Sequence, residues 1–133
     1  TRLLSDNPDI AHQIRLTDRI YDLHLHMHMQ KVVGDRLRPE GKRDPHGVED
    51  AKTRMQTTLD IVDRDMQGRT WAVAGSFTMA DCAAAPALYY ANLVVPFAGT
   101  HRSAAAYLDR LLQRPSFART VREAEPYRHM FPG

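Results

Sequence analysis

The chain has 133 residues, of which 43% are hydrophobic and 26% charged, as in an ordinary globular protein, and its formal net charge is only +2. Acidic and basic residues are interleaved, so there is no basic stripe for nucleic acid, and the sequence has neither a membrane-spanning apolar run nor a visible signal peptide. Its one cysteine, Cys82, excludes an intrachain disulfide and favours a reducing, cytoplasmic location.

A first long helix is predicted to begin at Asn7. Asparagine caps the free N–H groups of a helix start, Pro8 suits the first turn, and Asp9 favours the positive helix end. Apolar residues then recur at near-helical spacing as far as Val32. Gly34 is the expected end of this helix.

A second long helix is predicted to begin at Asp44 and Pro45 by the same reasoning. Its apolar positions recur at steps of three and four residues: Val48, Ala51, Met55, Leu59, Val62 and Met66. Gly68 is expected to end it. Residues 35–44 are rich in charge, glycine and proline and are expected to form a loop, so the two helices should pack as an antiparallel pair.

The clearest local signal is the segment from Phe77 to Cys82. A hydroxyl residue followed three positions later by a carboxylate is a capping box, in which Thr78 and Asp81 each accept from the backbone N–H of the other. Phe77 and Cys82 occupy the positions of a hydrophobic staple and are expected to be buried against each other. The nearly uncharged run at 82–95 predicts a helix at the centre of a bundle. All four residues are therefore interpreted as fold residues, neither an acid catalyst nor a nucleophile.

The last third of the chain predicts shorter helices. One begins at Ser103, and the segment Arg-Pro-Ser at 114–116 breaks it and starts another, which Pro126 stops. The aromatic tail at 127–132 is expected to be irregular and to pack back on the bundle. The expected fold is an all-α bundle of about five helices in one domain, residues 1–133.

Three features in this order resemble the C-terminal domain of glutathione transferases. They are Trp71-x-x-x-Gly75-x-x-Thr78-x-x-Asp81, the alanine-rich helix after it, and Arg-Pro-Ser-Phe-Ala-Arg at 114–119. The first helix also looks like the corresponding helix of bacterial members, and the resemblance covers nearly the whole chain. In that family the Thr-x-x-Asp box with its staple nucleates the core helix of the domain.

The resemblance implies that the family's thioredoxin-like N-terminal domain, which activates the glutathione thiol, is missing from these residues. The chain is then a fragment, or a relative that has lost the active half, and no catalytic residue is expected in it. The whole protein is expected to conjugate glutathione, as co-substrate and with no other cofactor, to small hydrophobic electrophiles in detoxification. A homodimer formed through the first two helices is also implied. The competing interpretation is a non-enzymatic binding or scaffolding module with the same fold.

By the same resemblance, the inner face of the first helix lines the pocket for the electrophile. The candidate residues are Tyr21, His24, Leu25 and His28. Tyrosine and histidine would give such a pocket apolar walls with polar tips. The alternative for Tyr21 is a place in the core.

Two further pairs on the first helix have candidate roles. Gln30 and Lys31 lie where bacterial members place a His-Lys pair that reaches glutathione, and the alternative for Lys31 is a solvated charge near a helix end. His24 and His28 are four residues apart, share a helix face, and could supply half of a zinc site. Zinc takes four ligands and a third is not evident in the sequence, so no metal is expected.

Overall fold

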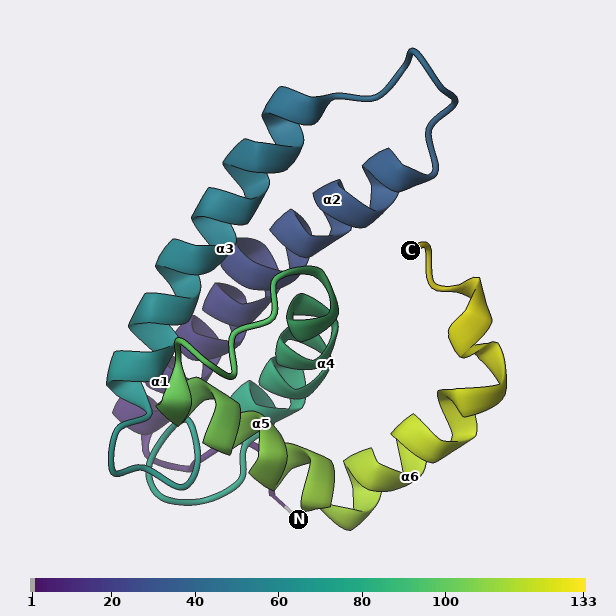
Figure 1. Cartoon of the computed structure of the whole chain (residues 1–133). Coiled ribbons are helices and arrows are strands. Elements are labelled where there is room, and N and C mark those ends of the chain that lie inside the picture. The colour runs from purple at the N-terminus through teal and green to yellow at the C-terminus, as the bar shows by residue number, and fades with distance from the viewer. Residues whose placement is uncertain (1) are drawn as a thin grey trace.

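The computed structural model describes residues 2–133 as a bundle of helices (Figure 1). The elements are α1 (Pro8–Ile20), the π-helix η1 (Tyr21–His26), α2 (Met27–Arg36), α3 (Pro45–Asp65), α4 (Met79–Val94), α5 (Arg102–Gln113), α6 (Pro115–Ala124) and the 3-10 helix η2 (Glu125–Met130). Because α1, η1 and α2 follow one another without a break, they form one long helix, called the first helix below. The predicted all-α bundle of about five helices is confirmed. No helix in this part of the chain is long and apolar enough to cross a membrane.

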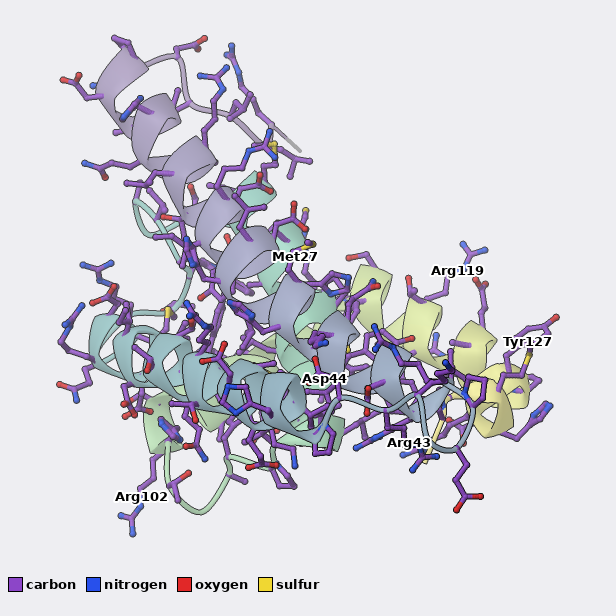
Figure 2. All side chains as sticks on the ribbon, turned by 90° about the horizontal axis from the view of Figure 1, so that it is seen from above. Met27, Arg43, Asp44, Arg102, Arg119 and Tyr127 are labelled. Carbon is purple, nitrogen blue, oxygen red and sulfur yellow. The ribbon has the colours of Figure 1, made fainter. Side chains whose placement is uncertain are left out.

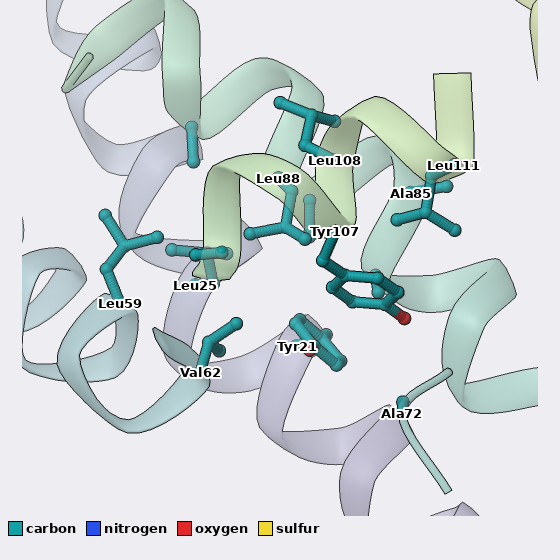
Figure 3. Close-up of a cluster of buried hydrophobic side chains, with 14 of the residues drawn as sticks. Tyr21, Leu25, Leu59, Val62, Ala72, Ala85, Leu88, Tyr107, Leu108 and Leu111 are labelled. Atoms are coloured by element: carbon teal, nitrogen blue, oxygen red, sulfur yellow. The ribbon is translucent and has the colours of Figure 1, made fainter. Parts of the chain in front are cut away.

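The core lies where the first helix, α3, α4 and α5 meet. The second half of the first helix and α3 run antiparallel, and α4 packs against α1 and η1 (Figure 1). Figure 3 shows Leu25, Leu59 and Leu88 in one cluster with Tyr21 and Tyr107. The three leucines are completely buried. Side chains from four helices therefore close a single apolar core, which is the main stabilising contribution in a bundle of this size.

Both long helices begin with the side-chain caps that the sequence predicts. The carboxamide oxygen of Asn7 accepts hydrogen bonds from the N–H groups of Asp9 and Ile10, at 2.9 and 3.3 Å. At the start of α3, the carboxylate of Asp44 accepts from the N–H of Gly47 at 2.9 Å. Each cap satisfies donors that have no partner within the helix.

The first helix ends later than the sequence predicts. Gly34 lies inside α2, which continues to Arg36. The carboxylate of Asp35 accepts from the N–H of Asp44 at 2.7 Å. Arg36 donates to the carbonyl of Pro132 at 2.9 Å. These tertiary contacts offset the cost of a glycine within a helix, which is about 1 kcal/mol.

A buried carboxylate joins the start of α4 to the rest of the bundle. Asp81 is fully buried, and it forms the capping box with Thr78. Its Oδ2 accepts from the N–H of Thr78 at 2.8 Å, and its Oδ1 accepts from the N–H of Ala72 at 2.9 Å. The hydroxyl of Tyr107, on α5, donates to the same Oδ1 at 2.6 Å. These groups are called the Asp81 network, and they satisfy a carboxylate that would otherwise be costly to bury.

The predicted staple between Phe77 and Cys82 is wrong, because the side chain of Cys82 is exposed. The ring of Phe77 packs edge-on against Trp71, with 5.3 Å between the ring centroids. The guanidinium carbon of Arg114 lies 3.5 Å from the centroid of the same ring. Trp71 and Arg114 thus contact the ring of Phe77, whereas most of the Cys82 side chain is exposed.

The C-terminal arm, residues 115–133, is held more loosely than the bundle. Neither α6 nor η2 contributes a buried residue. The arm leaves α5 and curves back until the C-terminus lies near α2 (Figure 1). There Phe131 stacks on Tyr90 of α4, with ring centroids 5.5 Å apart, next to the hydrogen bond between Arg36 and Pro132. The tail packs back as predicted, but most of it forms η2 and is not irregular.

Candidate functional site

A pocket lies between α2 and the end of the C-terminal arm. It is called pocket A, has a volume of about 310 Å³, and is lined by His26, Met29, Gln30, Val33, Gly34, Leu37, Tyr90 and Phe131. Most of this lining is apolar. The amide of Gln30 lies 2.9 Å from Nε2 of His26, so the two form a hydrogen-bonded polar pair. An apolar pocket with a few polar groups is typical of sites for small hydrophobic ligands.

Helical spacing explains why pocket A takes these residues from the first helix. His26, Gln30, Val33 and Leu37 are separated by four, three and four positions, which places them along one side of the helix. His24 and His28 fall on a different side. The histidine that reaches pocket A is therefore His26, which the sequence analysis did not propose as a site residue.

A second pocket, called pocket B, lies between α4 and the C-terminal arm. Its volume is about 270 Å³, and it is lined by Tyr89, Tyr90, Leu93, Val121, Ala124, Glu125, Tyr127, Arg128, Met130, Phe131 and Pro132. Figure 2 shows Tyr127 at the outer end of the arm. Tyr90 and Phe131 line both pockets.

His24 and His28 lie in a groove between the first helix and α3. This helix groove has a volume of about 470 Å³ and is lined by Ile20, His24, His28, Arg54, Thr57, Thr58 and Ile61. The hydroxyl of Thr58 donates to the carbonyl of His24 at 2.9 Å and ties the two helices together. Loss of water around His28 lowers its pKa, and the nearby Arg54 and His24 lower it further. These effects favour the neutral form of the His28 ring.

Tyr21 and Leu25, the other two candidates for the electrophile pocket, lie in the core. Their side chains are 3% and 0% exposed, and Figure 3 shows both within the central cluster. Burial raises the pKa of the Tyr21 hydroxyl far above its ordinary value, and the carboxylate of Asp81 raises it further. This placement agrees with the core alternative for Tyr21. The four candidates are thus divided between the core and the helix groove, and none of them lines pocket A.

Lys31 is paired within the chain. Its ammonium group donates to Oδ2 of Asp44 at 2.6 Å. This hydrogen bond and the one from the N–H of Gly47 hold the pKa of Asp44 below its ordinary value. The space is tight, because a Cβ at position 47 would lie 2.8 Å from Cγ of Asp44 and 2.9 Å from Cε of Lys31. Lys31 therefore ties α2 to the start of α3, whereas the neighbouring Gln30 faces pocket A.

Neither metal binding nor thiol chemistry is supported by the surroundings of the groups that suggested them. Within residues 2–133, no three His, Cys, Asp or Glu side chains come together in a way that would hold a metal ion. His24 and His28 instead share their groove with the cationic Arg54. For Cys82, partial burial raises the pKa of the thiol, and the carboxylate of Asp81 raises it further. Reactive cysteines have lowered pKa values, and the shift at Cys82 is in the opposite direction.

The sequence was also compared with known families. A family model for the C-terminal domain of glutathione S-transferases matches residues 45–118, more than half of the chain. The chain belongs to this family. No curated protein matches the sequence.

Solved structures of glutathione transferases contain the same fold. The chain is similar to a glutathione S-transferase from Methylobacillus flagellatus with glutathione bound, at 24% identity and a TM-score of 0.82, covering 89% of this chain and 59% of that one. It is similar to one from Methylobacterium radiotolerans in complex with glutathione sulfonate, at 26% identity, a TM-score of 0.75, and coverage of 87% and 56%. It is also similar to a glutathione transferase from Phanerochaete chrysosporium with oxidized glutathione, at 17% identity and a TM-score of 0.80, covering 96% of this chain and 58% of that one. The chain thus spans less than two thirds of each of these proteins.

In this glutathione S-transferase domain, Gln30 is the one residue of pocket A that was predicted from the sequence. Those not predicted include His26, Tyr90 and Phe131. The spacing between His26 and Gln30 carries a signal, because residues four apart share a helix face. Tyr90 lies in a helix that the sequence predicts to be buried all round, which hides its role in a pocket wall. No local signal places Phe131 beside Tyr90, since that contact depends on how the arm curves.

Proposed function

We propose that this chain is the ligand-binding half of a glutathione transferase, and that the whole protein conjugates glutathione to small hydrophobic electrophiles. The observation that carries the proposal is pocket A, a largely apolar cavity with the His26–Gln30 pair on its lining, in a domain of this family. The similar transferases hold glutathione, glutathione sulfonate or oxidised glutathione. We extend this ligand to the whole protein that contains the chain.

The proposed reaction is attack of the glutathione sulfur on an electrophilic carbon. The thiol gives up its proton to a group in a thioredoxin-like domain, and the thiolate supplies the electron pair of the new sulfur–carbon bond. With a halide substrate, the leaving group departs with the electron pair of the bond that breaks. Pocket A would hold the electrophile near the sulfur and so reduce the entropic part of the barrier. Gln30 is the proposed hydrogen-bond donor to glutathione, and Lys31 would act through its ion pair with Asp44.

The whole protein encoded by the complete reading frame provides the test. We expect it to conjugate 1-chloro-2,4-dinitrobenzene and to bind a glutathione column, with a reducing, cytoplasmic location and a role in detoxification. Residues 1–133 are proposed to fold as one domain around the single core, and this isolated domain should show no conjugating activity. Conjugation by the 133-residue chain alone would contradict the assignment of the chemistry to another domain.

A homodimer formed through the first helix and α3 is part of the proposal. An apolar stripe runs along the first helix beside the helix groove, at Leu16, Ile20, Leu23 and Met27. Leu23 and Met27 are 47% and 56% exposed, and exposed apolar surface of this kind is commonly covered in oligomers. Met27→Glu should convert a dimer into a monomer in size-exclusion chromatography with light scattering. Met130→Glu, at an exposed methionine of the C-terminal arm, should leave the mass unchanged.

The second candidate function is a non-enzymatic binding module with the same fold. The presence of pockets A and B is compatible with it. A whole protein that neither conjugates an electrophile nor binds glutathione would favour this function over the transferase.

A further inference from the structure

Tyr90 and Phe131 stand between pockets A and B. Both residues line both pockets, and their rings are stacked with an interplanar angle of 22° and centroids 5.5 Å apart. Tyr90 comes from the middle of the bundle and Phe131 from the tail. The pair, called the aromatic wall, therefore divides two spaces of similar size, about 310 and 270 Å³.

We infer that the aromatic wall sets the size of the ligand that this domain accepts. With the wall in place, a ligand is confined to one pocket of about 310 or 270 Å³. Without it, the two pockets join into a cavity that takes a ligand too large for either pocket alone. The inference rests on the proposed function, because it assumes that these pockets bind apolar ligands.

The wall is supported on both sides. The ring of Tyr89 packs edge-on against Tyr90 at 5.1 Å and against Phe117 of α6 at 6.1 Å, so a chain of aromatic rings connects the wall to the arm. On the other side, the hydrogen bond from Arg36 to Pro132 fixes the residue next to Phe131. The Tyr90 ring is thus supported by Tyr89, and the Phe131 ring is supported by the hydrogen bond at its neighbour Pro132.

The groups around the wall indicate the class of ligand. Pocket A carries the His26–Gln30 pair, and pocket B carries Arg128, which pairs with Glu125 at 3.5 Å and keeps further N–H donors. The remaining lining is mainly aromatic and aliphatic. A planar aromatic ring with an anionic or hydrogen-bond-accepting substituent fits either pocket.

Two probes of different size test the inference: benzenesulfonate, which one pocket can hold, and pyrene-1-sulfonate, which needs the joined space. Their dissociation constants would be measured by NMR titration of the isotopically labelled 133-residue chain, with the amides of Val33 and Val121 reporting on pockets A and B. Phe131→Ala should improve the binding of the larger probe relative to the smaller one by about tenfold, because more of the apolar surface of the larger probe is then buried. Tyr90→Ala removes the half of the wall that comes from α4 and should shift the relative binding of the two probes in the same direction.

Arg119→Ala is the matched control, because it removes an exposed side chain of the same arm that lines neither pocket. It should leave the ratio of the two dissociation constants unchanged. The inference is overturned if neither wall variant tightens the binding of the larger probe relative to that of the smaller one. This includes the case in which Phe131→Ala weakens the binding of both probes equally. If no variant and no wild-type chain binds either probe, the pockets do not bind aromatic ligands, and the ligand-binding role in the proposed function fails with the inference.

Discussion

The Asp81 network and the C-terminal arm are attached to the bundle by opposite means. In the network, a fully buried carboxylate accepts hydrogen bonds from the start of α4, the segment before it, and α5. In the arm, α6 and η2 bury no residue, and its end meets the bundle at a ring stack and a hydrogen bond to a backbone carbonyl. None of the residues of the Asp81 network lines pocket A or pocket B. Substitutions in the Asp81 network should therefore change the stability of the chain, and substitutions in the arm should change which ligands the pockets accept.

The largest expected effect is from Asp81→Ala. The substitution leaves the N–H groups of Thr78 and Ala72 and the hydroxyl of Tyr107 without their acceptor in a buried place. We expect the free energy of unfolding in urea to fall by about 4 kcal/mol. Asp109→Ala, at an exposed acid of α5, should change it by less than about 0.5 kcal/mol. A loss of stability no larger than that of the control would contradict the role given to the network.

Tyr107→Phe sharpens the comparison by removing a single bond of the network. The ring stays in the core, but Oδ1 of Asp81 keeps only the hydrogen bond from Ala72. The expected loss is about 2 kcal/mol, as for a hydrogen bond to a charged acceptor. Tyr127→Phe, on the exposed side of the arm, should be close to neutral in the same urea titration.

Two glycines within helices should respond in opposite ways to alanine. At Gly34 an added Cβ meets nothing within 4 Å, so Gly34→Ala should stabilise the chain by about 0.5–1 kcal/mol through helix propensity. At Gly47 the Cβ would displace Asp44 and Lys31, so Gly47→Ala should lower the Tm despite the same gain in propensity. Thermal unfolding followed by circular dichroism measures both. An increase in Tm for both variants would show that Asp44 and Lys31 can move away from an added Cβ at position 47 without loss of stability.

The ion pair between Lys31 and Asp44, which joins α2 to the start of α3, should depend on pH. The pKa of Asp44 lies below its ordinary value of 3.8, so the ion pair with Lys31 stabilises the chain above that pH and is lost as the pH falls through the lowered pKa. Lys31→Met should move the pKa back towards 3.8. The carboxyl ¹³C shift of Asp44, followed by NMR from pH 2 to 6, measures the change, and an unmoved midpoint would argue against the pairing.

The smallest expected effect on stability is from Arg36→Met in the attachment of the arm. Losing the hydrogen bond to Pro132 should cost about 0.5 kcal/mol or less, because the arm contributes little to the core. Hydrogen exchange of the amides in η2 should nevertheless become faster. If Arg36→Met destabilises the whole chain as much as Tyr107→Phe, the two regions do not differ in the way described.

Signals that act over three or four residues were enough to predict most of the fold. Asn7 and Asp44 cap their helices, and Thr78 starts α4, because a cap acts on the N–H groups that follow it directly. Contacts across the chain had no such signal. Asp63 of α3, for example, accepts from the N–H groups of Ser103 and Ala104 and caps α5 from about 40 residues away.

The candidate site was harder to predict for the same physical reason. His24, His26 and His28 are the same residue type on one helix, so the sequence does not distinguish their roles. The packing of that helix places His26 at pocket A and places His24 and His28 in the helix groove. Cys82 was assigned to the core from its place in the staple, but Trp71 and Arg114 cover the ring of Phe77 first. The family resemblance supplied the correct domain, since its motifs consist of local fold signals.

The π-helical turn η1 has a consequence for how the length of the first helix can vary. The N–H of Met27 bonds to the carbonyl of Asp22, five positions back, so the turn holds one residue more than an α-helical turn would. A chain with one residue fewer between 21 and 26 could form an unbroken α-helix there while α1 and α2 keep their present orientations. The same deletion within α2 would rotate the residues after it by about 100°. Length changes of one residue in related chains should therefore be concentrated at this turn.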